Sequence, residues 1–142
     1  MFGQDRHQLR QRYVDAWRKQ QAGQALQPLE ALIAEIVSLH PEYHHMLDQG
    51  EDTLDKDFLP ELGEANPFMH MGMHIAIREQ LATDRPAGIV AAYQQLLRKR
   101  QDAHAVEHDM MECLGRVLWE AQRAGGAPDE AAYLACVSKL HR

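Results

Sequence analysis

Cysteine is scarce in this sequence, and long apolar runs are absent. The two cysteines, Cys113 and Cys136, form neither a CxxC motif nor a disulfide framework. We therefore expect two free thiols, which suits a reducing cytosol. Residues 1–7 are polar and unlike a signal peptide, and every apolar run is much shorter than the roughly 20 residues of a membrane span. The sequence thus predicts a cytoplasmic protein that does not cross a membrane.

Basic residues are too few for a protein that neutralises a phosphate backbone. Lys and Arg total 15 against 21 Asp and Glu, which gives a net charge of -6, so nucleic acid is not an expected partner. Serine occurs only as Ser38 and Ser138, and no nucleophile elbow, phosphate loop or dinucleotide fingerprint is present. An enzyme built on this chain would therefore need a metal, and no organic cofactor is expected.

Helical periodicity runs through most of the chain. Apolar residues recur at three- and four-residue spacing, and no segment alternates as a β-strand does. The expected helices cover residues 4–22, 28–40, 66–83, 84–100, 102–124 and 129–140. At 142 residues the chain suits one domain, which would bury roughly 68% of its unfolded surface. We predict a single all-α domain over residues 1–142, a helical bundle with a four-helix core and short flanking helices.

Capping residues and prolines mark the expected boundaries. An Asn or Asp stands at positions 66, 84, 102 and 129, each at the start of an expected helix. Pro41 predicts a kink or a restart after His40, because proline removes an amide donor and disfavours helical geometry in the residue before it. The acidic stretch 48–63 contains Gly50, Pro60 and Gly63, and we expect a connector with at most a short helix around residues 54–58.

Six of the nine histidines are arranged in pairs with four-residue spacing. On an α-helix this spacing places two side chains on one face, one turn apart. Only the first pair is interrupted by a proline. The pairs are His40 with His44, His70 with His74, and His104 with His108.

The pairs suggest a transition-metal site. His70, His74, His104 and His108 would lie on facing helices, with Glu107 as a carboxylate ligand and His40 or His44 from a third helix. Glu107 falls within the apolar arc of its helix, where a carboxylate is costly unless it is paired, hydrogen-bonded or bound to a cation. Such nitrogen-rich sets fit zinc or non-haem iron. The methionines near His70 are better explained as core residues than as copper ligands.

A second interpretation needs no metal. Buried histidines commonly bond to backbone carbonyls or to acids, and such a seam fixes the register of packed helices. The protein would then be a non-catalytic helical interaction or structural protein. Whether it is an enzyme, whether it forms a homodimer and which protein it binds all stay open.

Several strings of the sequence carry a family resemblance. They are Leu39-His40-Pro41-Glu42-Tyr43-His44, residues 66–70, residues 74–80, residues 84–89, Glu107-His108 and residues 118–122. Together they resemble an uncharacterised proteobacterial family catalogued as a domain of unknown function, number 1841. The resemblance implies a bacterial cytoplasmic protein and no particular activity. A looser architectural likeness is to hemerythrin-like bundles, which hold two irons, although the chain lacks their His-x-x-x-x-Asp element.

Overall fold

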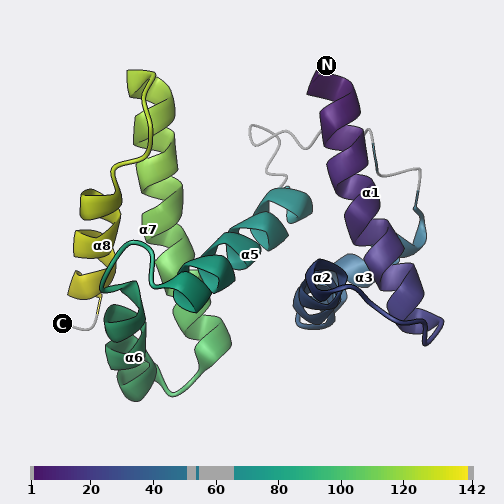
Figure 1. The fold of residues 1–142 in the computed structure, drawn as a ribbon, viewed down its shortest axis with the longest axis horizontal. Coiled ribbons are helices and arrows are strands. Elements are labelled where there is room, and N and C mark those ends of the chain that lie inside the picture. Colours follow the sequence, from purple (N-terminus) through teal and green to yellow (C-terminus); the bar gives the residue numbers. More distant parts are fainter. Residues whose placement is uncertain (1, 51–53, 55–65, 141–142) are drawn as a thin grey trace. The chain divides into compact units, whose positions relative to one another are not determined.

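The computed structural model describes residues 2–50, 54 and 66–140, with side chains from residue 6 onward. Figure 1 shows helices and connecting segments throughout this part, with no strand among the described residues. The chain is therefore all-α, as predicted. It divides into two compact units, residues 1–75 and 76–142. The single domain and the four-helix core stay predictions.

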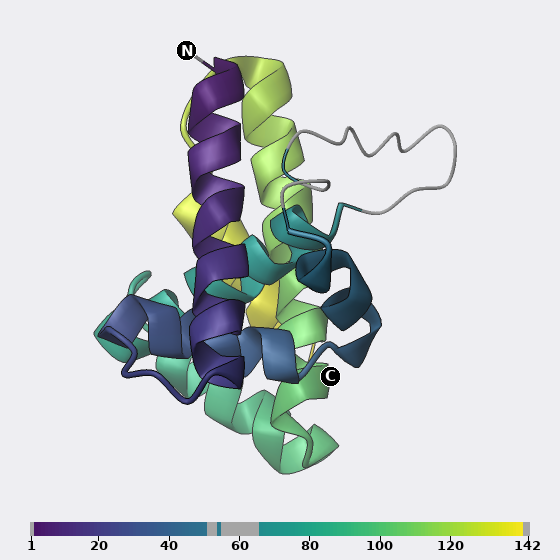
Figure 2. The same cartoon turned by 90° about the vertical axis from the view of Figure 1, so that its right-hand side faces the viewer.

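The first unit is built on α1 (Phe2–Gln21) and α2 (Pro28–Ser38). Figure 2 shows α1 crossing α2, and α1 also packs against the short helix α3 (His44–Asp48). The first turns of α5 (Pro67–Thr83) complete this unit. Its buried core consists of Tyr13, Val14, Ala16, Trp17, Ile33, Ile36, Val37, Leu47, Leu54, Phe68 and Met71.

Pro41 interrupts the helical geometry between α2 and α3. Helix α2 ends at Ser38, and a 3-10 turn, η1 (Pro41–Tyr43), begins with proline at its first position. His40 is the N-cap of that turn, with φ -126° and ψ 70°, which is outside the helical region. The predicted restart is confirmed, and His40 and His44 therefore do not share one regular helix.

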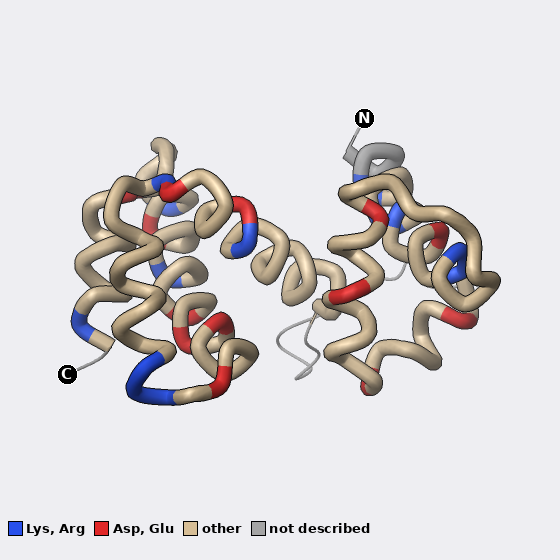
Figure 3. Tube along the Cα trace, turned by 60° about the horizontal axis from the view of Figure 1, so that its bottom comes forward, with Lys and Arg blue, Asp and Glu red and all other residues tan. Residues whose placement is uncertain are grey.

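The second unit contains the rest of α5 together with α6 (Ile89–Arg100), α7 (Ala103–Ala124) and α8 (Glu130–Lys139). Helices α6, α7 and α8 pack pairwise against one another. Side-chain caps start two of them: Asp102 accepts hydrogen bonds from two amides of α7, and Asp129 accepts one from Ala132. Figure 3 shows both charge signs in each unit, and the basic residues that end α6 lie where the helix dipole favours cations.

The start predicted for α6 is wrong by about one turn. The sequence places it at Asp84-Arg85-Pro86, but α6 begins at Ile89 after Gly88, whose φ is +100°. Asp84 still supplies the capping group, because its carboxylate accepts hydrogen bonds from the amides of Gly88 and Val90. The carboxylate of Asp84 thus stabilises a turn, residues 84–88, that precedes the helix.

The prediction of two free thiols is also wrong. Cys113 on α7 and Cys136 on α8 form a disulfide, with their Cα atoms 5.8 Å apart and a sequence separation of 23. The pairing depends on how α7 and α8 pack, which sequence spacing does not reveal. The cytoplasmic location therefore loses its support from the cysteines and stays a prediction.

Residues 51–53 and 55–63 of the expected connector lie outside the described residues, and so does most of the short helix expected around residues 54–58. Leu54 is described and is fully buried, and its carbonyl oxygen accepts a hydrogen bond from Arg10 at 3.1 Å. Among the described helices, none is long and apolar enough to cross a membrane.

Tyr133 provides a test of packing in the second unit. Its side chain is 3% exposed and donates a hydrogen bond to Gln80 at 2.6 Å, and burial raises its pKa to about 12. Because this pKa lies above the ordinary value of 10, the protonated phenol stabilises the fold fully below pH 10, and that contribution is lost as the pH rises through 12. We expect the stability advantage of the parent over Tyr133→Phe to shrink by up to about 2 kcal/mol across this range. Urea unfolding of both proteins at several pH values measures it, and a constant difference would contradict the burial.

Candidate metal centre

His40 is held in one tautomer by the end of α2. Its Nδ1 lies 2.8 Å from the carbonyl oxygen of Ile36, and the side chain is 2% exposed. A carbonyl only accepts hydrogen bonds, so Nδ1 carries the proton, and in the neutral ring Nε2 keeps its lone pair. This arrangement is typical of metal-binding histidines, whose second nitrogen donates to a backbone carbonyl and fixes the ring.

The Nε2 atom of His40 faces His70 on α5. The two Nε2 atoms are 3.1 Å apart. The ring of His74, one helical turn further along α5 and fully buried, has its centre 4.8 Å from that of His40 and 4.9 Å from that of His70. With 4.9 Å between the rings of His40 and His70 as well, the three imidazoles form a nearly equilateral triangle, which we call the histidine triad.

The spacing of the His40 and His70 nitrogens suits one metal ion. Two nitrogen ligands of a tetrahedral zinc ion, each about 2.0–2.1 Å from the metal, lie about 3.3 Å from each other. The 3.1 Å between the His40 and His70 nitrogens is close to this value. The same distance also suits a direct hydrogen bond, in which His70 Nε2–H donates to the lone pair of His40. Geometry thus leaves both the metal and the seam interpretation standing.

His44 is directed away from the triad. Its Nε2 lies 2.8 Å from the carbonyl oxygen of Val37, and its ring packs on Trp17 with 4.3 Å between centres. Trp17 in turn donates a hydrogen bond to Asp48. These contacts join α1, α2 and α3, so His44 works here as a packing residue, and its assignment as a metal ligand stays a prediction.

In the second unit, His104 and His108 stand together on the first turns of α7. Their ring centres are 4.2 Å apart, and both side chains are partly buried. The helix places them on one face, as the four-residue spacing predicts. The predicted convergence of all three pairs stays a prediction.

Arg78 is the charged residue that the sequence interpretation missed. Its Nε and Nη2 donate to the two carboxylate oxygens of Glu107 at 3.1 and 3.3 Å. The carboxylate is 5% exposed, so this two-point ion pair explains how Glu107 can lie in an apolar arc without a metal. The spacing contained a signal: Arg78 follows His74 by four residues and so shares its helix face. Arg78 donates to both carboxylate oxygens of Glu107. The role of Glu107 as a metal ligand stays a prediction.

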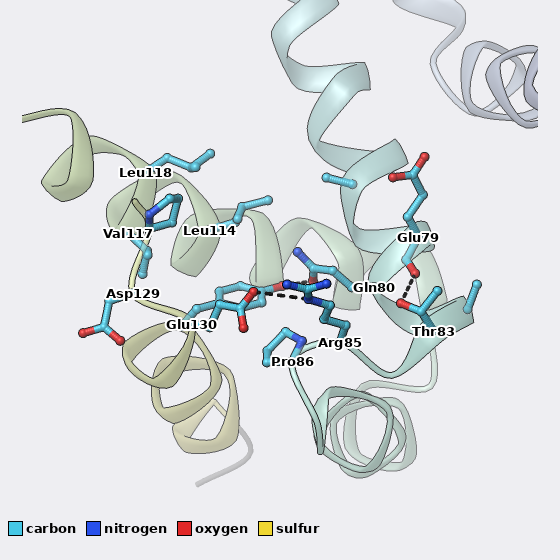
Figure 4. Close-up of a pocket in the computed structure, with 14 residues that line it drawn as sticks. Glu79, Gln80, Thr83, Arg85, Pro86, Leu114, Val117, Leu118, Asp129 and Glu130 are labelled. Carbon is cyan, nitrogen blue, oxygen red and sulfur yellow. Dashed lines mark hydrogen bonds and ion pairs between the residues drawn. The ribbon is translucent and has the colours of Figure 1, made fainter. Parts of the chain in front are cut away.

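A cavity of about 690 Å³ lies in the second unit. Figure 4 shows Arg85 and Glu130 directed toward each other there, and their ion pair spans 3.7 Å. Apolar side chains of α7 and the hydrogen-bonded Tyr133 form much of the wall. None of the histidines predicted as metal ligands lines this cavity.

The fold and the buried, clustered imidazoles place this chain in the class of all-α proteins with a histidine cluster. The chain belongs to the family described as "Domain of unknown function (DUF1841)", whose model matches residues 5–139. None of the curated proteins and none of the solved structures compared with it gives a significant match. The likeness to hemerythrin-like bundles stays a prediction.

The ion pair of Arg78 and Glu107 predicts an asymmetric response to mutation. Arg78→Ala leaves a carboxylate buried without its cation, so we expect a loss of about 3 kcal/mol of unfolding free energy. The double variant Arg78→Met/Glu107→Leu removes both charges and should lose clearly less. Arg85→Ala is the matched control, because Arg85 is 80% exposed and its surface ion pair contributes at most about 1 kcal/mol. Urea unfolding gives all three values. Equal costs for Arg78→Ala and Arg85→Ala would show that Glu107 does not depend on Arg78.

Proposed function

We propose that the protein binds one transition-metal ion through His40, His70 and His74. The observation that carries this proposal is the pair of facing Nε2 atoms, 3.1 Å apart, one of which has its lone pair fixed by a backbone hydrogen bond. His74 supplies the third imidazole, within 4.9 Å of both rings. The burial of His40 and His74 supports the proposal, because a metal satisfies several ring nitrogens at once.

Zinc and ferrous iron are the metals that this ligand set favours. Neutral imidazoles suit both, and the triad offers no thiolate that would select copper(I). Three protein nitrogens leave a fourth position of a tetrahedral ion for water or another ligand. A bound metal would polarise a water molecule at that position, while the residues of the triad hold the ion. The proposal assigns metal binding and no reaction.

The competing function is a helical scaffold whose histidines form a hydrogen-bonded seam. Two contacts favour it: the His40–His70 distance, which is also a hydrogen-bond distance, and the bond of His44 to the carbonyl of Val37. In this case His70 donates its proton to His40, and the triad joins α5 to the end of α2. The two functions differ in one respect, which is the bound metal.

The metal content of the purified protein distinguishes metal binding from the scaffold function. The protein is purified without chelator and without metal-affinity chromatography, and its metals are quantified by mass spectrometry. We expect about one equivalent of zinc or iron in the parent and its loss in His70→Ala/His74→Ala. Zinc at 100 times its dissociation constant should raise the unfolding free energy of the parent by about 2.7 kcal/mol and that of the variant by much less.

His45→Ala is the matched control, because His45 is an exposed histidine on α3 whose ring contacts the side chain of Gln49. It should keep the full metal content. A further variant, His104→Ala/His108→Ala, tests the sequence prediction that these histidines share the ion. A folded parent that contains no metal, takes up none and unfolds identically with and without zinc would establish the seam.

A further inference from the structure

The disulfide between α7 and α8 joins one buried and one partly exposed cysteine. Cys113 is 2% exposed, whereas Cys136 is partly exposed. Figure 1 shows α7 and α8 side by side in the second unit. A surface opening of about 300 Å³ reaches the pair, and its lining includes both cysteines. Of the two cysteines that line the opening, Cys136 is therefore the more open to a reactant from solution.

The charges around the opening favour an anion. Arg116 donates from Nη2 to the sulfur of Cys136 at 2.8 Å. Lys139 on α8 also lines the opening, and Glu112 on α7 is the one acid among its lining residues. A guanidinium beside a sulfur stabilises the thiolate over the thiol, and the thiolate is the form that attacks and leaves in disulfide exchange. The two cations outnumber the acid, so an acidic reactant is attracted.

We propose that Cys113 and Cys136 form a thiol–disulfide exchange site that reacts with a small acidic thiol or its disulfide. The incoming thiolate attacks Sγ of Cys136, forms a mixed disulfide and releases the sulfur of Cys113, which takes up a proton. A second thiolate attacks the sulfur of the bound small thiol and releases the thiolate of Cys136. Two small thiols are thereby oxidised to one disulfide, and the protein disulfide is reduced to two thiols. The reverse sequence oxidises the protein.

A purely structural disulfide is the alternative. A bond that closes such a loop stabilises a fold by lowering the entropy of the unfolded chain. Such a bond needs neither an opening nor a cation at one sulfur. The exchange site requires both, and it does not depend on the proposed metal.

Glutathione, an acidic thiol, is the probe that tests the proposal. The full-length protein is incubated with reduced and oxidised glutathione, quenched with acid and mapped by mass spectrometry. We expect millimolar glutathione to open the disulfide of the folded protein, with a mixed disulfide on Cys136. In Cys113→Ser the adduct on Cys136 accumulates, because the thiol of Cys113, which would displace the glutathione and re-form the protein disulfide, is absent.

Arg116→Gln keeps both cysteines and tests the role of the cation. We expect the attack of reduced Cys136 on oxidised glutathione to slow about two- to fivefold, because the thiolate that Arg116 stabilises becomes scarcer, an effect partly offset by the higher nucleophilicity of the remaining thiolate. Arg123→Gln is the matched control, since Arg123 lies on the same helix over the ring of Trp119 and should leave the rate unchanged. A disulfide that resists millimolar glutathione until the protein unfolds, an adduct on Cys113, or an equal rate in Arg116→Gln and the parent would overturn the proposal.

Discussion

The hydrogen bond from His40 Nδ1 to the carbonyl of Ile36 sets the chemistry of the triad. The carbonyl lies in the last turn of α2, where it also accepts a hydrogen bond from the amide of Leu39 at 3.1 Å, so the bond from His40 ties its imidazole to the helix terminus. Without it the ring of His40 could take either tautomer, and its Nε2 would not present a lone pair to His70. Both the metal and the seam interpretation begin from this one bond.

Proline makes that bond geometrically available. A continuous helix through residue 44 would have placed His40 and His44 on one face, and the carbonyl of Ile36 would have bonded to the amide of residue 40. Pro41 ends this geometry, and the ring nitrogen of His40 takes the position at the carbonyl instead. His44 then turns to the carbonyl of Val37 and to Trp17. Pro41 thus gives the two histidines of this pair different roles: His40 is a candidate metal ligand, and His44 is a packing residue.

Local features of this fold could be predicted from the sequence, and features that depend on packing could not. Helix starts at Asn66, Asp102 and Asp129 follow from side chains that bond to nearby amides, so local chemistry was sufficient. The spacing of His70 and His74 likewise fixed their common face. By contrast, the partner of Glu107 lies 29 residues away on another helix, and Cys113 meets Cys136 only because α7 and α8 are adjacent. The predicted burial of Glu107 indicated that a cation must lie beside it. It did not distinguish an arginine from a metal ion.

The central claim is that imidazole nitrogens of the triad surround one ion, and X-ray absorption at the zinc edge tests it most directly. Zinc-loaded parent should show a shell of nitrogen at about 2.0–2.1 Å with the outer scattering of about three imidazoles. His40→Gln should lose about one third of that outer signal. A shell made of water oxygens, unchanged in His40→Gln, would contradict the account and leave the triad as a hydrogen-bonded seam.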